Sequence, residues 1–521
     1  MTENYTLHYL EERLASSRPF GDAEYLDTCT TDLYRARLDM LSAHLPEARA
    51  LLESLLGASQ AAQIDVLRDP VVRNSINDAL VYFRLDKTLP PGVSVREWAT
   101  ILELARSFIK SSPDGSSPLE AGLERRVHLS GQPNGCVIWC GARGDDVIAS
   151  KFISLFKSKF PKLRLIEPES EEIALFTAGA NLLDEMLPLL GRSALRHVHI
   201  LAIAGAAHGA LPPFTSVTHP NILGTMFLSR SVLKNEWLVA ESLLHEALHV
   251  KFLDLRHTHS LLCHGYTDEV SKTIRPHWNR PKPGRENVWS VDRSLTVLHV
   301  YVCLALFFRK LQQCHEDFLI RFGQRYTSTN PHLSARRSFD RARYLAEELG
   351  GCQELGAAGK AFLMWLSKVL DELDPNPAAP GSWTHLLLDR YSRECHEIDY
   401  VVASANANRD IEVMEQVAGM LREEAIAAEH ITRVMGDPNS ATKFSDTVAR
   451  LDQFPYRDDR PSAMAIRTEV QAALVSAADW GKQDERARVD GLVLDLVERS
   501  SERVNTLVAR YRPQLRSPVE A

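Results

Sequence analysis

An HExxH motif, His245 to His249, constrains this chain more than any other feature of its sequence. The motif lies in a strongly helical stretch, residues 236–255, which Asn235 can cap. Two residues four positions apart on an α-helix lie one above the other on the same face, so both imidazoles can reach a single metal ion. Burying two histidines and Glu246 in an apolar wall is costly unless they have partners. The motif therefore predicts a metal site on a buried helix.

The composition is that of a globular protein with several apolar cores. The 521 residues are 45% hydrophobic and 25% charged, enough for roughly two to four domains. The net charge of −8 argues against nucleic acid or an anionic membrane as a partner. The eight cysteines form no C-x-x-C pair, which indicates reduced thiols and a metal that is not held by sulfur.

Targeting signals are not evident in the sequence. The first residues, Met-Thr-Glu-Asn-Tyr-Thr, lack the basic and then apolar layout of a secretory signal. The longest apolar run, residues 297–308, is too short to span a bilayer. We therefore expect a cytoplasmic protein without a membrane partner.

Periodicity divides the chain into three regions. Residues 1–118 have helical periodicity and end in a run rich in Ser, Pro and Gly. Residues 119–320 alternate short strand-like runs with helices and contain the motif, and residues 321–521 are helical again. The expected fold class is α-rich α+β: a helical N-terminal region, a mixed α/β middle region with a metal site on two packed helices, and a helical C-terminal region.

A third ligand is needed, because catalytic zinc and non-haem iron each take three protein ligands. His299 is the first candidate, since it lies in the apolar helix at 297–308, where a lone buried histidine needs a partner. Glu269 is the alternative, because a thermolysin-like zinc peptidase takes a glutamate about twenty or more residues beyond the motif. A metzincin is excluded, since Phe252 and Leu255 stand where that class has Gly and His.

Two blocks of sequence resemble a known family. The first comprises residues 214–218, 224–229 and the motif helix, and the second comprises Trp289, Asp292, Arg293 and His299 with the apolar helix that follows. Over residues 214–310 the chain resembles the HExxH proteins associated with ribosomal-peptide modification. The resemblance implies an iron(II)- and 2-oxoglutarate-dependent dioxygenase that hydroxylates the β-carbon of a peptide side chain.

The resemblance also implies roles for single residues. His245, His249 and His299 would hold the iron, and the distal carboxylate of 2-oxoglutarate needs a fixed cation. Arg293 is the first choice for that cation. Lys251 is the second choice, although on the helix it points away from His249 and could simply face solvent.

Glu246 distinguishes two enzyme classes. In a hydroxylase it would orient water or a metal ligand without binding the metal, whereas in a zinc metallopeptidase, the alternative function, it would be a general base acting on water. A third possibility is a non-enzymatic peptide-binding scaffold that retains the motif as a relic.

A peptide is the expected partner, and a leader-bearing precursor peptide is a further candidate. Residues 275–285 carry four positive charges and three prolines, so they could form either a lid that meets an acidic peptide or an ordinary solvated loop. The histidines His257, His259 and His264, between the motif and His299, are expected to be solvated loop residues. The sequence fixes neither the modified residue nor the oligomeric state.

Overall fold

The structure of the chain is a computed structural model. It describes residues 3–86, 89, 94–111, 126–127, 136–141, 146–206, 215–280, 286–323, 331–374, 377, 383–453, 463–478 and 483–511. The chain forms two compact units, each assembled from three segments. Unit 1 comprises Met1–Thr267, Leu295–Ser338 and Gln353–Pro375, and unit 2 comprises Asp268–Ser294, Phe339–Cys352 and Asn376–Ala521.

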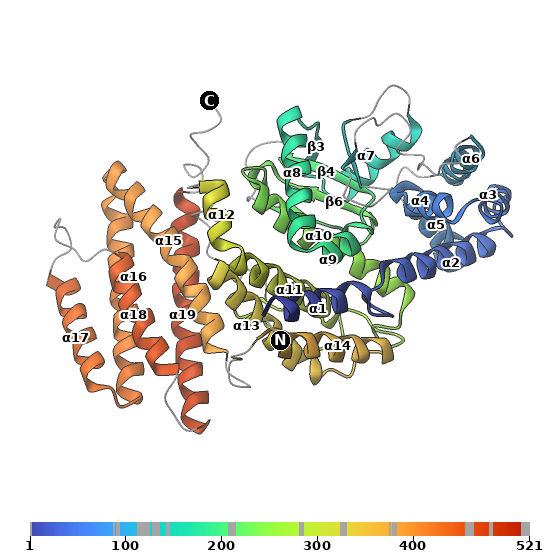
Figure 1. Cartoon of the computed structure of the whole chain (residues 1–521). Helices are drawn as coiled ribbons and strands as arrows, with labels where there is room; N and C mark the ends of the chain where they lie inside the picture. The colour runs from blue at the N-terminus through green and yellow to red at the C-terminus, as the bar shows by residue number, and fades with distance from the viewer. Residues whose placement is uncertain are drawn as a thin grey trace. The chain divides into compact units, whose positions relative to one another are not determined.

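The expected α-rich α+β class is confirmed, because helices predominate and unit 1 contains one small mixed sheet (Figure 1). Its helices are α1 (Glu3–Ser16), α2 (Ala23–Leu41), α3 (Pro46–Leu56), α4 (Gln60–Arg68), α5 (Pro70–Val81), α6 (Val95–Ser111), α7 (Val147–Lys159), α8 (Ser170–Met186), α9 (Pro188–Leu195), α10 (Glu236–Thr258), α12 (His315–Phe322) and α14 (Ala357–Leu373). Two further helices, α11 (Val291–Gln313) and α13 (Pro331–Gly350), have residues in both units.

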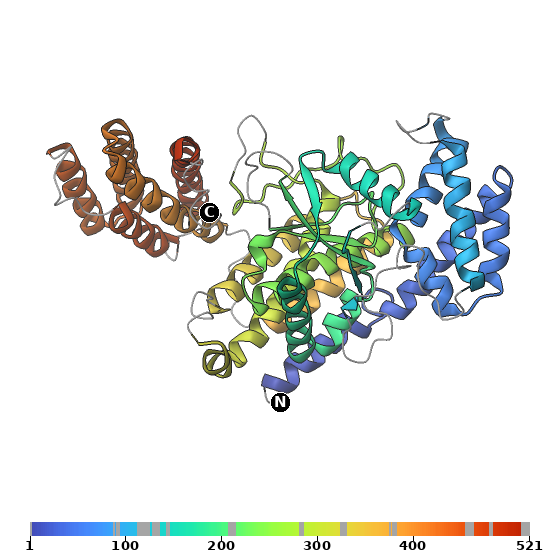
Figure 2. The ribbon, with the colours of Figure 1, turned by 90° about the horizontal axis from the view of Figure 1, so that it is seen from above.

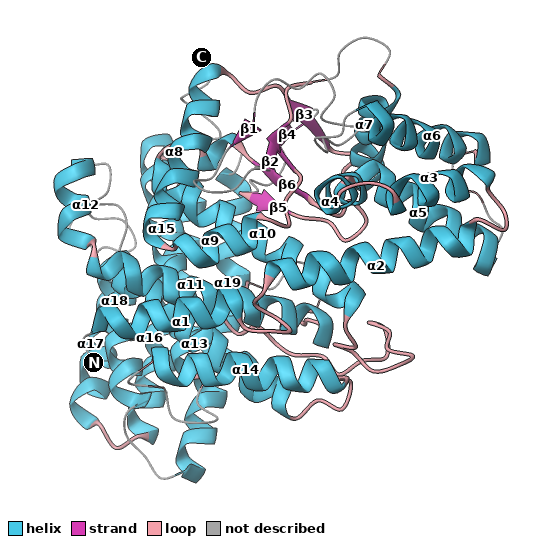
Figure 3. Ribbon diagram, turned by 45° about the vertical axis from the view of Figure 1, so that its right-hand side comes forward, coloured by secondary structure: helices cyan, strands magenta, loops and turns pink. Residues whose placement is uncertain are grey.

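The sheet has the strand order β1-β2-β4-β6-β5, and β3 also pairs with β4 (Figure 3). The central strand β4 runs parallel to β2 and β6 and antiparallel to β3. Its first five residues are all buried, as expected for a strand that is covered on both faces. The strands are β1 (Arg126–Val127), β2 (Cys136–Ile138), β3 (Leu163–Ile166), β4 (Ile200–Ala206), β5 (Ser216–Val217) and β6 (Thr225–Leu228).

The N-terminal helices share a hydrophobic core with the sheet. Tyr34 on α2, Trp98 on α6, Phe152 on α7 and Phe227 on β6 belong to one cluster of buried side chains. The expected boundary near residue 118 therefore does not separate two units, because apolar side chains from both sides of it pack together. The sequence pattern showed where the helices end and the strands begin, but not that both contribute to one core.

Helix α10 carries the HExxH motif and packs against α2, α8, α9, β5 and β6. The expected cap is confirmed, since the side chain of Asn235 accepts a hydrogen bond from the backbone N–H of Leu238 at 3.0 Å. Gly179 on α8 permits a close approach, because a Cβ there would lie 2.4 Å from Cγ1 of Val239. The expectation of a loop at His257 was wrong, since α10 continues to Thr258.

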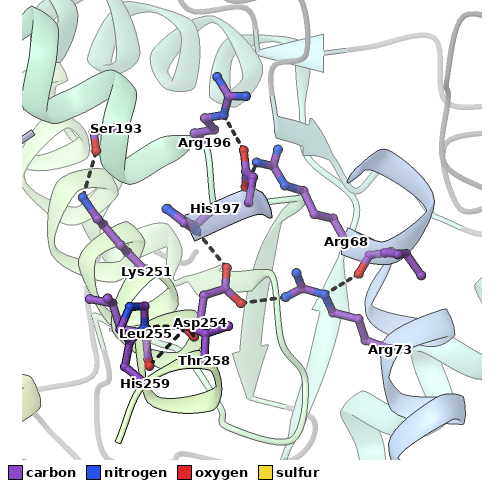
Figure 4. Close-up of polar contacts among 12 residues, drawn as sticks. Arg68, Arg73, Ser193, Arg196, His197, Lys251, Asp254, Leu255, Thr258 and His259 are labelled. Carbon is purple, nitrogen blue, oxygen red and sulfur yellow. Dashed lines mark hydrogen bonds and ion pairs between the residues drawn. The ribbon is translucent and has the colours of Figure 1, made fainter. Parts of the chain in front are cut away.

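A cluster of buried charges surrounds the second half of α10 (Figure 4). Asp254 Oδ1 accepts a hydrogen bond from Arg73 Nη1 at 2.9 Å, and Asp254 Oδ2 lies 2.8 Å from His197 Nδ1. Burial raises the pKa of Asp254, but the nearby Arg73 and His197 outweigh it and hold that pKa well below its usual range. A second carboxylate, Asp27, pairs with Arg68 and Arg196. The pairs of Asp254 connect α10 to α5 and to the segment before β4, and the pairs of Asp27 connect α2 to α4 and to the same segment.

Unit 2 is largely a helical bundle, whose members lie side by side in orange to red in Figure 2. Arg467 forms an ion pair with Glu424 inside it, and Tyr391 donates to the same carboxylate. The bundle helices are α15 (Thr384–Asn408), α16 (Ile411–Val434), α17 (Pro438–Gln453), α18 (Ala463–Ala478) and α19 (Gln483–Tyr511).

The described part of the cationic segment belongs to unit 2 and is tied to the bundle. Arg280 pairs with Glu394 and Glu397, and Arg275 pairs with Glu498. Residues 281–285 lie outside the described residues. The two described arginines of residues 275–280 thus have carboxylate partners within unit 2, and a lid over a peptide stays a prediction.

Among the described residues, one helix, α11, is long and apolar enough to cross a membrane. The apolar segment is thus longer than the run recognised from the sequence, because the helix extends it at both ends. However, 72% of its most apolar window is buried inside the protein, which is typical of a core helix of a soluble protein.

Removing the Asp254 carboxylate should destabilise unit 1, because Arg73 and His197 would be left buried without their partner. We expect Asp254→Ala to lower the free energy of unfolding in urea by about 3–5 kcal/mol. The matched control is Glu185→Ala, which breaks an exposed ion pair with Arg321 and should cost less than about 1 kcal/mol. Equal effects of the two substitutions would contradict a dominant role for the buried cluster.

Candidate metal site

The two motif histidines converge on one point. His245 Nε2 lies 3.1 Å from His249 Nε2, and the ring centroids are 4.9 Å apart. Two nitrogens that bind the same ion at about 2.0–2.1 Å, with a nitrogen–metal–nitrogen angle of about 90–110°, would be separated by about 2.8–3.4 Å. The observed separation therefore fits two ligands of one metal ion. A single shared proton also fits this distance in the metal-free protein.

The environment of His245 keeps its imidazole in the ligand form. Burial lowers the pKa of His245 to about 4, so the ring is neutral at physiological pH. The side chain nevertheless keeps a relative exposure of 35%, which leaves the pair open to small molecules. The helix thus presents neutral nitrogens at a partly open surface of unit 1.

Glu246 lies beside the pair and is fixed by the sheet. Its Oε1 is 3.9 Å from His245 Nε2, and the hydroxyls of Ser216 and Thr218 donate to its carboxyl group. Burial raises the pKa of Glu246 and the two hydrogen bonds lower it. Burial has the larger effect, and the resulting pKa is about 7. Its Oε2 is buried without a hydrogen-bond partner among the described residues. A carboxyl group with this pKa can exchange a proton near neutral pH.

Glu241 is a buried acid near the motif that the sequence reasoning did not single out. It precedes His245 by four positions, so on α10 it lies on the same face as both histidines. Burial raises the pKa of Glu241 to about 7. The sequence contains the signal: Glu241, His245 and His249 follow one another at intervals of four residues.

His299 is buried in unit 1, as expected from its apolar surroundings, with 1% of its surface exposed. Its ring centroid lies 6.3 Å from that of Phe252 and 5.4 Å from that of Phe362. Burial, together with Lys251 and His197, lowers the pKa of His299 to about 3, so the imidazole is neutral. Its Nδ1 is a buried atom with no hydrogen-bond partner in the described part of the chain.

The structure brings two of the expected ligands together and not the third. Among the described residues, no three His, Cys, Asp or Glu side chains are gathered as a metal site. His299 therefore stays a predicted ligand. Glu269, the alternative for a zinc peptidase, is exposed in a turn of unit 2.

The two candidate cations differ in their surroundings. Lys251 does not face solvent, which corrects that alternative: it is fully buried, and its Nζ donates to Gly21 O at 2.7 Å and to Ser193 Oγ at 2.8 Å (Figure 4). Arg293 is exposed near the start of α11, and its guanidinium carbon lies 4.9 Å from the centroid of the Trp289 ring. Lys251 thus helps to hold α10 in place, whereas Arg293 lies at the surface of unit 2.

Glu246 should give the metal-free protein a distinctive pH dependence of stability. Its pKa rises from 4.5 to about 7 in the folded state, so the stabilisation present below pH 4.5 is lost as the pH rises through 7. Glu246→Gln cannot ionise and should be more stable than wild type at pH 8, by on the order of 3 kcal/mol, but not at pH 4.5.

Urea unfolding of the metal-free protein at these two pH values measures the difference. Glu269→Gln is the matched control, because that side chain is exposed, and it should follow the wild type at both pH values. A Glu246→Gln variant that differs from wild type by the same amount at both values would show that burial does not control this carboxyl group.

Comparison with known proteins finds no family model that matches this chain and no curated protein that matches it. The resemblance to the peptide-hydroxylase family therefore depends on the motif and on the residues around it.

Proposed function

We propose that this chain is a non-haem iron(II)- and 2-oxoglutarate-dependent dioxygenase that hydroxylates a side chain of a ribosomally made peptide. The observation that carries the proposal is the convergence of His245 and His249 at 3.1 Å on a buried helix. His245, His249 and His299 would hold the iron, at which dioxygen would be the oxidant: one oxygen atom would go to the peptide carbon and the other to 2-oxoglutarate, which is converted to succinate and CO2.

The protein residues bind and orient. Burial keeps the imidazoles of His245 and His299 neutral, so no proton has to leave either ring before a metal binds near pH 7. The carboxyl group of Glu246, fixed by Ser216 and Thr218 on the sheet side of α10, provides a polar group beside the open coordination positions.

Support for His299 comes from its neighbour on α10. Its ring packs against Phe252, which follows His249 by three positions and shares that face of the helix. His299 thus packs against α10 about one turn beyond His249. The partnerless Nδ1 of His299 is a buried polar atom for which packing alone provides no reason.

Arg293 remains our choice for the 2-oxoglutarate carboxylate. Lys251 already donates to a carbonyl and a hydroxyl in the interior, whereas the planar guanidinium of Arg293 is exposed and suits a two-pronged bond to a carboxylate. We also propose a cytoplasmic location, where 2-oxoglutarate and reduced thiols are both present, and a peptide substrate, with a leader-bearing precursor as a candidate.

A zinc metallopeptidase is the second candidate, and Glu246 favours it. A carboxyl group 3.9 Å from His245 Nε2 with a pKa of about 7 has the position and proton affinity of a general base for water. In that enzyme the same two histidines would hold zinc, and Glu246 would take a proton from the attacking water.

Metal content and product identity separate the two functions. Protein purified without oxygen should contain about one iron per chain and, once oxygen and a peptide substrate are supplied, should convert 2-oxoglutarate to succinate and CO2. Both His249→Ala and His299→Ala should lose the iron while the protein remains folded. His264→Ala, which removes an exposed histidine, should keep it.

Bound zinc together with peptide cleavage would replace the hydroxylase with the peptidase. If the purified protein contains no metal, both enzyme functions are excluded and the peptide-binding scaffold remains. Full iron occupancy in His299→Ala would exclude that residue as the third ligand.

Exchanging Arg293 for lysine tests the carboxylate anchor. Arg293→Lys keeps the positive charge but loses the planar guanidinium that makes two parallel hydrogen bonds to a carboxylate. We therefore expect the half-saturating concentration of 2-oxoglutarate to rise by an amount that corresponds to a free energy on the order of 1–3 kcal/mol. Iron should remain bound. Lys251→Met should lower stability instead, because the carbonyl of Gly21 and the hydroxyl of Ser193 lose their donor. An unchanged 2-oxoglutarate requirement in Arg293→Lys would mean that another cation binds the carboxylate.

A further inference from the structure

A cavity of about 800 Å³ opens in unit 1 at the far end of the motif helix. Arg37 on α2, Asn74 and Asp78 on α5, Lys151 and Lys159 on α7, and His257 on α10 line it, together with the segment that leads into β6. The motif residues do not line it. We refer to this space as the α2–α7 cavity.

Cations outnumber anions in the walls of the α2–α7 cavity. Arg37, Lys151 and Lys159 face one carboxylate, Asp78. Glu97 pairs with Lys151 at 2.7 Å and offsets its positive charge. The remaining charges in the cavity wall are the two cations Arg37 and Lys159 and the one carboxylate of Asp78.

The pKa values of two neighbouring histidines are lowered mainly by burial and secondarily by the cations of the cavity. Burial, followed by Arg37, lowers the pKa of His257 to about 4. Burial and Lys159 lower the pKa of His219 on the adjoining segment. At neutral pH both imidazoles are uncharged, and the cavity attracts anions.

The walls of the cavity are held by the main core of unit 1. Tyr34 on α2, Ile76 on α5, Ile222 before β6 and Leu155 on α7 are buried members of one cluster, so the cavity is formed before any ligand arrives.

A hydrogen-bond acceptor also points to a ligand. Asn74 donates through Nδ2 to the carbonyl of Asn221 at 3.3 Å. Its Oδ1 is buried and has no hydrogen-bond partner among the described residues. Asn74 therefore provides an unused acceptor in the cavity wall, which a ligand carrying a hydroxyl, amine or amide group would reach when the side-chain amide turns.

The cavity is a second site and not part of the histidine site. His257 follows His249 by eight positions, which corresponds to about 12 Å along a helix axis. This distance is greater than the length of a five-carbon diacid, so one such molecule would not reach both histidines. One short segment borders both places: Ser216 and Thr218 contact Glu246, whereas Asn221 lines the cavity.

We propose that the α2–α7 cavity binds a small organic acid, with Arg37 and Lys159 holding its carboxylate and Asn74 accepting a hydrogen bond from a second polar group. Guanidinium and ammonium donors make the strongest hydrogen bonds when the acceptor is charged. Arg37 Nη1 donates to Asn77 Oδ1 at 2.6 Å, so Arg37 would bind the carboxylate through its remaining N–H groups. The site is independent of the metal and of the proposed reaction.

Calorimetric titration of the full chain tests the proposal, with succinate and malate as probes. We expect Lys159→Gln and Arg37→Gln each to raise Kd about tenfold, since each removes one charge-assisted contact. Malate should bind more tightly than succinate, because its hydroxyl can donate to Asn74. Lys157→Gln is the matched control, because Lys157 is an exposed lysine on the same helix outside the cavity.

Further variants keep the outcome unambiguous. Lys159 is exposed, so Lys159→Gln tests the site even if Arg37→Gln unfolds. His249→Ala should bind malate as wild type does, whereas loss of binding there would place the acid at the histidine pair instead. The proposal would be overturned if neither acid bound, if Lys157→Gln weakened binding as much as Lys159→Gln, or if inorganic phosphate bound more tightly than both acids.

Discussion

The carboxylate of Asp254 determines how helix α10 is placed, and the candidate metal site depends on that placement. Asp254 is bonded to Arg73 and His197, and one turn earlier Lys251 donates to the carbonyl of Gly21. These partners come from three distant parts of the sequence. Because buried ionic bonds tolerate little change in length or angle, α10 can neither slide nor rotate without breaking several of them at once. The motif histidines, which precede Lys251 and Asp254 on the same helix, are positioned by contacts that they do not make themselves.

The chemistry at the motif depends on burial, which shifts the pKa values of acids and bases in opposite directions. Burial lowers the pKa of His245 to about 4 and raises that of Glu246 to about 7. Between these values both side chains are largely uncharged, so the low-dielectric wall costs little in the metal-free protein. Next to a divalent cation Glu246 would lose its proton, because a positive charge stabilises the carboxylate. Metal binding and the charge of Glu246 would therefore be coupled.

Local features of the fold could be predicted from the sequence, and long-range ones could not. The spacing of His245 and His249 and the cap at Asn235 depend only on helix geometry, and the structure contains both. The burial of Lys251 could not be foreseen, because its acceptors Gly21 and Ser193 lie far away in the chain. The burial of His299 followed from its apolar neighbours, but its distance from the pair depends on how helices pack. Local periodicity contains no information about that packing.

The division of the chain into interleaved segments has a consequence for biosynthesis. His299 lies in the second segment of unit 1, and Phe362, which packs against its ring, lies in the third, after two segments of unit 2 have been made. On a ribosome that releases the chain from its N-terminus, the apolar surface around His299 stays uncovered until α14 emerges. Unit 1 can finish folding only after its last segment, Gln353–Pro375, has been made, and unit 2 only after Asn376–Ala521 has followed. A fragment ending before residue 353 would expose the interior of unit 1, so the smallest piece that can enclose the candidate site extends at least through α14.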